Sequence, residues 1–232
     1  MATVAIRNRL LGALLPSDRD LLAPHLRHVT LPLRQDLERP DRRIENIYFI
    51  EAGIASVVAE LQAEVSVEVG LIGCEGMSGM AVLLGTEQTP HSTYMQVAGE
   101  GQKISVKQFR AALEASDTLR DVLLKFVHVF MMQTSQTAIA NARIPLARRL
   151  ARWVLMAQDR GRDNVLPLTH EFLALMLGVR RAGVTETLQI LKRQKLIETA
   201  RNLIVVKDRK GLQRIAGAAY GLLEREYRRL LG

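Results

Sequence analysis

The amino-acid sequence predicts an α+β fold in which a mostly β N-terminal half is followed by one long helix and a helical, basic C-terminal third. Two patterns carry this prediction. Apolar residues alternate with period two between residues 44 and 104, and they recur with a helical period from about residue 118 onward. With 48% hydrophobic and 24% charged residues, the 232-residue chain has the composition of a globular protein and can bury a full core.

The first 30 residues predict an amphipathic helical stretch that restarts at Pro16. Its leucines lie at spacings that one helix face could gather: Leu10, Leu14, Leu21, Leu22 and Leu26. The apolar run after the first arginines is short and lacks a small-residue cleavage site, so it does not predict a secretory signal. Because no apolar stretch approaches the ~20 residues of a membrane helix, we expect a soluble, cytoplasmic protein without a membrane partner.

Residues 1–117 are expected to form a β-roll domain. The segment NIYFIEAGIASVVAEL predicts two strands around a turn at Gly53, and the following VSVEVGLIG alternates in the same way. Eight of the sixteen glycines fall between Gly53 and Gly101, which suits short strands and tight turns that close a small barrel or roll.

Residues 118–143 are expected to form one long helix that ends in a hinge at Ile144 and Pro145, because proline disfavours helix at the residue before it. Its stripe recurs at three- and four-residue steps: Leu119, Leu123, Phe126, Phe130, Thr134 and Thr137. Such a stripe could pack on the chain's own β-domain, or it could pair with a second copy. We expect the second, with a homodimer interface formed by Leu119, Leu123, Phe126 and Phe130.

Residues 144–232 are expected to form a winged helix-turn-helix domain. Its first helix should bury Leu146, Leu150, Trp153, Val154 and Ala157 and keep Arg148, Arg149 and Arg152 outside. The segment LIETARNLIVV predicts a hairpin around Arg201 and Asn202, which would be the wing.

The helix-turn-helix is predicted by the stretch from Thr169 to Ile197. Thr169 is a good N-cap, Gly178 can supply the left-handed turn, and Val179 can plug that turn. The apolar side of the first helix would be Phe172, Leu173, Leu175, Met176 and Leu177, and that of the second Val184, Leu188 and Leu191. Arginines at the start of the second helix could enter a major groove and bind guanine O6 and N7.

The charge distribution agrees with nucleic-acid binding by the C-terminal third alone. Residues 141–232 hold 19 Lys and Arg against 8 Asp and Glu, a net charge of +11, whereas residues 1–140 hold 13 against 16, a net charge of −3. Phosphate contacts need concentrated cationic side chains, so double-stranded DNA is the expected partner. A merely solvated basic surface is the alternative.

The whole chain then resembles the Crp/Fnr family of bacterial transcription regulators. The segments that carry the resemblance are IYFIEAG, IGCEGMSG, RLARWVL, LTHEFLALMLGVRRAGVTETL and LIVVKDR. The resemblance implies a cyclic-nucleotide-binding-like jelly roll, a homodimer joined along the long helix, a palindromic operator, and RNA polymerase as a further partner. It also implies that the β-roll responds to a small-molecule effector.

The resemblance assigns residues to both functions. Carried over residue by residue, the guanine-reading arginine is Arg181, while Arg180 and Thr169 would contact phosphates and Ala182 could only touch a thymine methyl. The candidate DNA-binding residues are Thr169, Arg180, Arg181, Gly183, Thr185, Glu186, Gln189 and Lys192. The candidate effector residues are Met80, His91, Ser92, Thr134 and Ser135. Hydroxyls softening a dimer seam are the alternative for Thr134 and Ser135.

Cyclic AMP is not the expected effector. Members that bind it carry a glutamate for the ribose and an arginine for the cyclic phosphate, and those positions fall near Met80 and near His91 or Ser92. A phosphate without its cationic partner forfeits a bond worth roughly 1.5–3 kcal/mol. No cofactor is expected, because one cysteine cannot ligate an iron–sulfur cluster and no haem-ligand motif is present.

Three weaker alternatives stay open at this point. His25 and His28 could share a helix face as metal ligands, although surface histidines are the simpler interpretation and no metal is expected. Cys74 could be a redox switch, although Glu75 would raise its pKa and simple burial is the alternative. The chain could instead be a ligand-binding or protein-interaction module, whereas the absence of nucleophile, P-loop and HExxH motifs argues against an enzyme.

Overall fold

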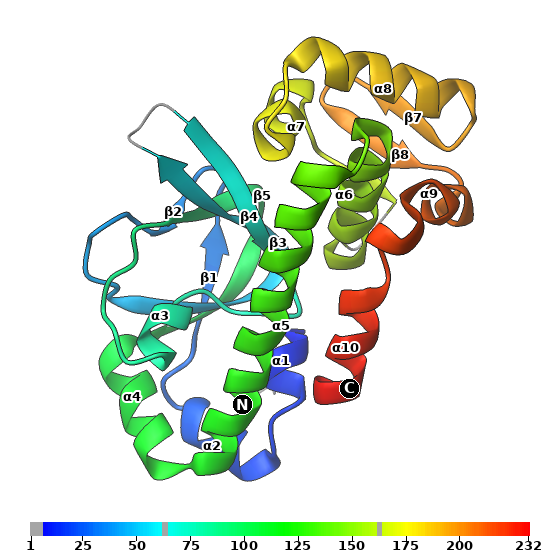
Figure 1. The fold of residues 1–232 in the computed structure, drawn as a ribbon. Coiled ribbons are helices and arrows are strands. Elements are labelled where there is room, and N and C mark those ends of the chain that lie inside the picture. The colour runs from blue at the N-terminus through cyan, green and yellow to red at the C-terminus, as the bar shows by residue number, and fades with distance from the viewer. Residues whose placement is uncertain (1–6, 62–64, 162–163) are drawn as a thin grey trace.

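The structure is a computed structural model that describes residues 7–61, 65–161 and 164–232. A β-roll forms the N-terminal half, a long helix runs along it, and a small helical domain with its own sheet sits at the far end of that helix (Figure 1). The N-terminal elements are α1 Arg9–Gly12, α2 Pro16–Leu22, β1 Arg27–Leu31, β2 Asp36–Glu38, β3 Asn46–Leu61, β4 Val65–Ile72, α3 Met80–Leu83, β5 Ser92–Ser105 and α4 Val106–Ala115. The elements that follow are α5 Asp117–Arg143, α6 Leu146–Arg160, β6 Val165–Leu166, α7 His170–Leu177, α8 Arg181–Arg193, β7 Ile197–Ala200, β8 Leu203–Val206, α9 Arg209–Ala216 and α10 Leu222–Leu231.

The β-roll is an antiparallel sheet in the order β1-β5-β3-β4, with β2 also paired to β5. The prediction of two strands around a turn at Gly53 is wrong, because β3 is one strand of 16 residues. Gly53 has a φ of +86°, and the register between β3 and β5 shifts around it, so the glycine forms an irregularity inside the strand. Since β5 pairs with β3 on both sides of Gly53, the chain cannot reverse there.

The N-terminal leucines lie on two short helices, α1 and α2, on the link between them and just after α2. Leu10, Leu14 and Leu22 are buried in the core of the β-roll, whereas Leu21 is 37% exposed and does not share their face. His25 and His28 do not share a helix face either, because His28 lies in β1. Their nearest polar partners differ: the His25 ring lies 3.2 Å from Gln108 Nε2, and His28 Nε2 lies 3.5 Å from Glu100.

The long helix α5 has 27 residues and begins at the Ser116 hydroxyl, which accepts the N–H of Leu119 at 3.1 Å. The predicted dimer residues Leu119, Leu123 and Phe126 are at most 3% exposed and belong to the core of the β-roll. Phe130 packs against the same core, so the expected dimer seam is wrong for this face. The cause is Gly70 and Gly76, whose missing side chains leave room for the rings of Phe130 and Phe126.

The C-terminal domain packs α6, α7, α8 and α9 around one apolar core, with β6, β8 and β7 as its sheet. Leu150, Trp153, Val154 and Ala157 on α6 are buried as predicted. Arg152, expected outside, is only 5% exposed: its Nε donates to the Ala219 carbonyl at 3.1 Å. Burial lowers the pKa of Arg152 to about 10.

The two domains share a packed interface. Ile54, Val58 and Leu71 of the β-roll belong to the same apolar cluster as α6 and α7. The last helix, α10, returns along α5 toward the N-terminal helices, and Tyr227 donates its hydroxyl proton to the Glu75 carbonyl at 2.9 Å (Figure 1). The C-terminal helix therefore joins the C-terminal domain to the β-roll.

None of the helices in the described ranges is both long enough and apolar enough to cross a membrane.

Candidate nucleic-acid interface

The helix-turn-helix is formed by α7 and α8 with three residues between them. Thr169 caps α7 by accepting the N–H of Phe172 at 3.0 Å, as the sequence predicted. Gly178 ends α7 in the left-handed region at φ +58°, and its N–H and that of Val179 return to the carbonyls of Leu175 and Ala174. The Arg149 guanidinium donates to the Leu177 carbonyl, which further fixes this turn.

Helix α8 presents one face to the core and another to solvent. Val184, Leu188 and Leu191 are fully buried, which confirms the predicted inner face. Leu175 on α7 is an exception to the predicted apolar side, because it is 40% exposed. The exposed or half-buried residues of the outer side include Arg180, Arg181, Gly183, Thr185, Glu186, Gln189 and Lys192. Their contact with DNA stays a prediction.

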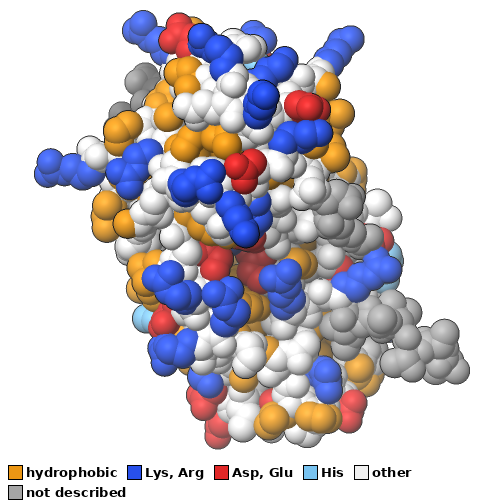
Figure 2. Space-filling view, turned by 90° about the vertical axis from the view of Figure 1, so that its right-hand side faces the viewer, with side chains coloured by type: hydrophobic (Ala, Val, Ile, Leu, Met, Phe, Trp, Pro, Cys, Tyr) orange, Lys and Arg blue, Asp and Glu red, His pale blue; other side chains and the backbone are white. Residues whose placement is uncertain are grey.

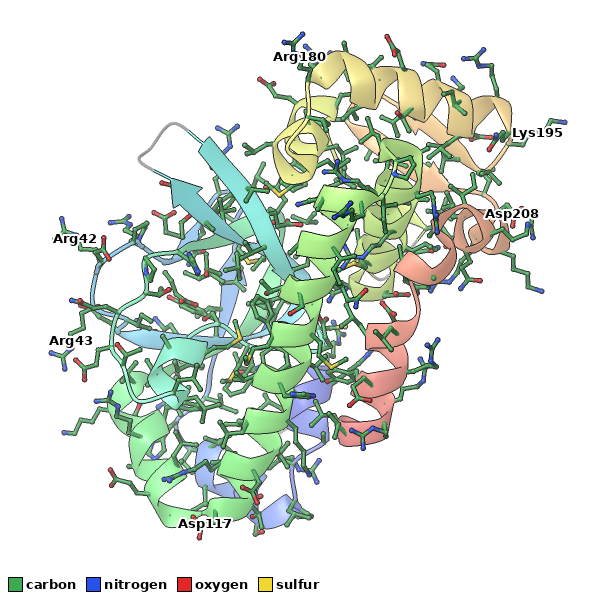
Figure 3. All side chains as sticks on the ribbon, viewed as in Figure 1. Arg42, Arg43, Asp117, Arg180, Lys195 and Asp208 are labelled. Carbon is green, nitrogen blue, oxygen red and sulfur yellow. The ribbon has the colours of Figure 1, made fainter. Side chains whose placement is uncertain are left out.

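The N-terminus of α8 is open to an anion. Arg180 is the N-cap residue, no side chain caps the helix, and its first turn contains no acidic residue. Figure 3 shows Arg180 pointing away from the protein at this end of α8, with Lys195 projecting beyond the other end. Free backbone N–H groups at a helix start and the positive end of the helix dipole both favour a phosphate.

The Thr185 hydroxyl is bonded within the protein, which the sequence did not indicate. It lies 3.0 Å from His170 Nδ1 and donates to the Arg181 carbonyl at 3.1 Å. These bonds tie the first turns of α7 and α8 together. Thr185 therefore positions the start of α8 in addition to facing outward.

The wing is the predicted hairpin of β7 and β8, which turns at Arg201 and Asn202. Asn202 has a φ of +58°, a conformation that asparagine tolerates better than most residues. The Arg201 side chain is exposed at the tip, and Lys and Arg side chains gather over the upper part of the face in Figure 2. Arg201 was not among the DNA-binding candidates predicted from the sequence. Its place at the turn of the predicted wing could have identified it as a candidate.

The predicted effector residues lie on α5, at α3 and around the start of β5. Thr134 donates to the Phe130 carbonyl at 3.2 Å and Ser135 to the Met131 carbonyl at 3.0 Å, so both hydroxyls bond their own helix. Met80 opens α3, whereas His91 directly precedes β5 and Ser92 is its first residue.

The amide at the start of α3 already binds a carboxylate. Glu38 accepts the N–H of Gly79 at 2.7 Å inside the β-roll, and burial raises the pKa of Glu38 against the effect of that bond. A phosphate placed there would meet this carboxylate. The expectation that cyclic AMP is not the effector stays a prediction.

Cys74 is half-buried, and burial raises the pKa of its thiol, with Glu75 acting in the same direction. A thiol with a raised pKa holds less of the reactive thiolate, which disfavours the redox interpretation. Within residues 7–61, 65–161 and 164–232, no cluster of three or more His, Cys, Asp or Glu is placed to hold a metal ion.

A buried carboxylate, Glu68 of β4, joins the two domains. It accepts the indole N–H of Trp153 on α6 at 2.8 Å and the hydroxyl of Ser56 at 2.7 Å. Burial raises the pKa of Glu68 to about 7, although both hydrogen bonds and the charges of Arg160 and Arg152 oppose this.

We expect the free energy of unfolding to fall as the pH rises from about 4.5 to about 7, because folded Glu68 keeps its proton longer than unfolded Glu68 does. Glu68→Gln keeps an uncharged acceptor for Trp153 and should remove most of this slope, as urea unfolding at several pH values would measure. The pKa of Glu38 is raised as well, so Glu38→Gln is the matched control: it measures the part of the slope that Glu38 contributes. A slope unchanged in Glu68→Gln would contradict the assignment.

The fold is a β-roll joined through a long helix to a winged helix-turn-helix domain. Residues 148–215 match the family model of the Crp-like helix-turn-helix domain. The chain thus carries a Crp-like helix-turn-helix domain on the fold of Crp/Fnr regulators, and the resemblance found in the sequence is confirmed.

Solved structures show the same fold at low sequence identity. A transcriptional regulator of the Crp/Fnr family from Eubacterium rectale is 14% identical, with 89% of this chain and 97% of that chain covered and a TM-score of 0.68. FixK2 from Bradyrhizobium japonicum is 13% identical, with coverage of 84% and 99% and a TM-score of 0.72. The c-di-GMP responsive global regulator CLP from Xanthomonas campestris is 17% identical, with coverage of 82% and 98% and a TM-score of 0.64. Among curated proteins, none matches the chain by sequence.

Proposed function

We propose that the protein is a homodimeric transcription regulator that reads a palindromic DNA site with α8. The observation that carries this proposal is the start of α8, where an uncapped helix N-terminus without acidic residues is flanked by the exposed Arg180 and Arg181. An arginine on such a helix can reach guanine in the major groove while the backbone amides hold a phosphate. The exposed Arg201 at the wing tip adds a second place for phosphate contact.

The dimer is proposed on a different face of α5 from the one the sequence suggested. Leu124, Met131 and Ile139 are 38%, 62% and 53% exposed, and they follow one another along the helix away from the β-roll core. Large apolar side chains on a helix face gain free energy when a second copy covers them. Two copies related by a twofold axis would present two α8 helices to two half-sites.

Further partners follow from this proposal. A regulator of this class acts on RNA polymerase in the cytoplasm, and a small-molecule effector would act by changing how the C-terminal domain sits on the β-roll. The two domains share a large apolar core and the hydrogen bond between Trp153 and Glu68. This domain interface is therefore the element whose arrangement an effector would change.

Selection of bound sequences from random DNA duplexes tests the proposal. We expect a palindromic consensus whose half-sites lie about one helical turn apart. Enrichment of no sequence, together with capture of protein partners only, would favour the protein-interaction module instead.

Arg181→Ala should cost about 1–3 kcal/mol on the selected operator and relax the choice of one base pair in each half-site, because alanine cannot bind guanine. Arg180→Ala is the matched control, since removal of a phosphate-binding group should weaken all sequences alike. Both affinities can be measured by fluorescence anisotropy on the operator and on a shuffled duplex. Equal decreases on the two duplexes for Arg181→Ala would remove its role as a base-reading residue.

A further inference from the structure

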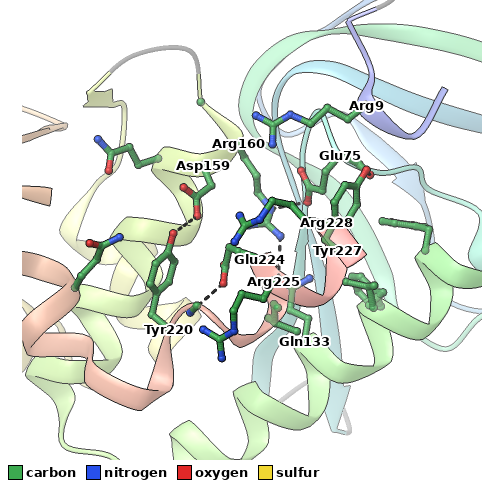
Figure 4. A pocket seen from close by; sticks show the side chains of 18 of the residues that line it. Arg9, Glu75, Gln133, Asp159, Arg160, Tyr220, Glu224, Arg225, Tyr227 and Arg228 are labelled. Atoms are coloured by element: carbon green, nitrogen blue, oxygen red, sulfur yellow. Dashed lines mark hydrogen bonds and ion pairs between the residues drawn. The ribbon is translucent and has the colours of Figure 1, made fainter. Parts of the chain in front are cut away.

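A cavity of about 640 Å³ lies between the two domains, on the side of the molecule where α10 returns along α5 (Figure 4). It is lined by residues of α1, by the loop after β4, by the ends of α6 and α9, and by α5 and α10. Its size is that of sites for small organic ligands. It is distinct from α8, which lies at the opposite end of the C-terminal domain from the free end of α10 (Figure 1).

Arginines dominate the charge of this interdomain cavity. The lining contains three acidic residues, Glu75, Asp159 and Glu224, and five arginines, Arg9, Arg160, Arg209, Arg225 and Arg228. Arg160 Nε lies 2.7 Å from Glu75 Oε1, and Arg209 lies 2.6 Å from Asp159 Oδ1. Glu224 accepts the N–H of Gly221 at 3.0 Å. Each acidic residue is thus already engaged.

Three arginines remain without a carboxylate partner in the part of the chain that the structure describes: Arg9, Arg225 and Arg228. They come from both domains. Burial is the main cause that raises the pKa of Tyr227. Arg9 and Arg160 lie close enough to the Tyr227 hydroxyl for their charges to oppose that rise. Figure 4 shows Arg9, Arg160 and Arg228 converging on one region of the cavity. Like charges held together repel, and an anion placed among them relieves that repulsion.

The other lining groups narrow the class of ligand. The rings of Phe126, Phe130, Tyr220 and Tyr227 line the cavity beside the arginines. Guanidinium groups bind phosphate oxygens in pairs of parallel hydrogen bonds, and aromatic rings cover a flat organic group. The chemistry is therefore that of an organic phosphate with more than one negative charge.

We propose that this interdomain cavity binds a phosphate-bearing organic anion, held by Arg9 from the β-roll side and by Arg228 from α10. Because the ligand bridges both domains, its binding favours one arrangement of the C-terminal domain on the β-roll. This inference rests on the proposed function only in treating the ligand as an effector, since binding itself involves no DNA.

Isothermal titration calorimetry of the full chain tests the proposal with three probes at physiological salt: ATP, inorganic pyrophosphate and uncharged adenosine. We expect ATP to bind more tightly than pyrophosphate, and adenosine not to bind. Arg9→Gln and Arg228→Gln should each weaken ATP binding about tenfold or more, because each removes a charge-assisted hydrogen bond. These side chains are exposed, so both variants should keep the unfolding temperature of the parent chain.

Two control variants locate the binding. Arg34→Gln/Arg42→Gln removes two exposed arginines from the β-roll outside the cavity lining, and it should leave ATP affinity unchanged. Arg180→Ala/Arg181→Ala should abolish operator binding yet keep ATP affinity, which separates this proposal from the proposed function. The proposal is overturned if neither ATP nor pyrophosphate binds. It is also overturned if either control lowers ATP affinity as much as Arg9→Gln does.

Discussion

The affinity of the protein for its operator should fall roughly 10³–10⁵-fold between about 50 and 200 mM salt. Each phosphate neutralised by Lys or Arg releases counterions, and a dimer that makes about 6–10 such contacts reaches this range. The expected contacts come from the N-termini of two α8 helices, with the exposed Arg180, and from two wing tips with Arg201. These four arginines fall short of that number, so further exposed cations near α8, such as Lys192 and Lys195, are expected to contribute.

The measurement is an anisotropy titration of operator DNA at several salt concentrations, with the slope of the logarithm of the association constant as the result. Arg201→Ala should lower that slope by about one for each phosphate that the arginine no longer neutralises. A matched control is Arg42→Ala, because this exposed arginine belongs to the β-roll. Binding that ignores salt, or a slope that changes equally in both variants, would contradict a phosphate-binding surface on α8 and the wing.

Met131→Glu should convert the protein from a dimer to a monomer and with it remove tight binding to the palindromic operator. Met131 is 62% exposed on α5, so the substitution leaves the folded chain intact. In the proposed dimer, however, a carboxylate would be buried near its own twofold copy, and burying an unpaired charge costs far more than one apolar contact contributes. Sedimentation equilibrium measures the mass, and circular dichroism checks the fold.

Two further substitutions serve as controls for Met131→Glu. Leu33→Glu changes a residue that is 57% exposed in the loop between β1 and β2, and it should leave the mass unchanged. Phe126→Glu should instead unfold or destabilise the chain, because Phe126 is 3% exposed in the core of the β-roll. A dimeric mass for Met131→Glu would show that α5 pairs through another face or not at all.

Local patterns in the sequence predicted the helix-turn-helix and the wing well. The cap at Thr169, the left-handed turn at Gly178 and the hairpin at Asn202 each depend on a few consecutive residues and their backbone preferences. The buried side of α8 followed from the spacing of Val184, Leu188 and Leu191. The family resemblance agreed with these patterns because it is carried largely by the same segments.

The candidate effector site was not predictable in this way. The residues taken over from the resemblance, such as Thr134 and Ser135, bond to their own helix. The interdomain cavity instead brings Arg9 beside Arg228, which lie near opposite ends of the chain. A run of residues gives no signal for such a pairing, because nothing in the local pattern of α10 says which surface it will cover.

The sequence by itself determined the helix-turn-helix, the helix before it and the wing in the C-terminal third, and it placed the excess positive charge there, whereas α9 and α10 were not predicted. Only the tertiary structure decided which partner each apolar or charged face meets. The stripe of Leu119, Leu123 and Phe126 would suit a second copy or the chain's own sheet, and Gly76 in the β-roll makes room for the Phe126 ring. Periodicity states that a face must be buried, whereas the shape of the surface opposite it determines what buries it.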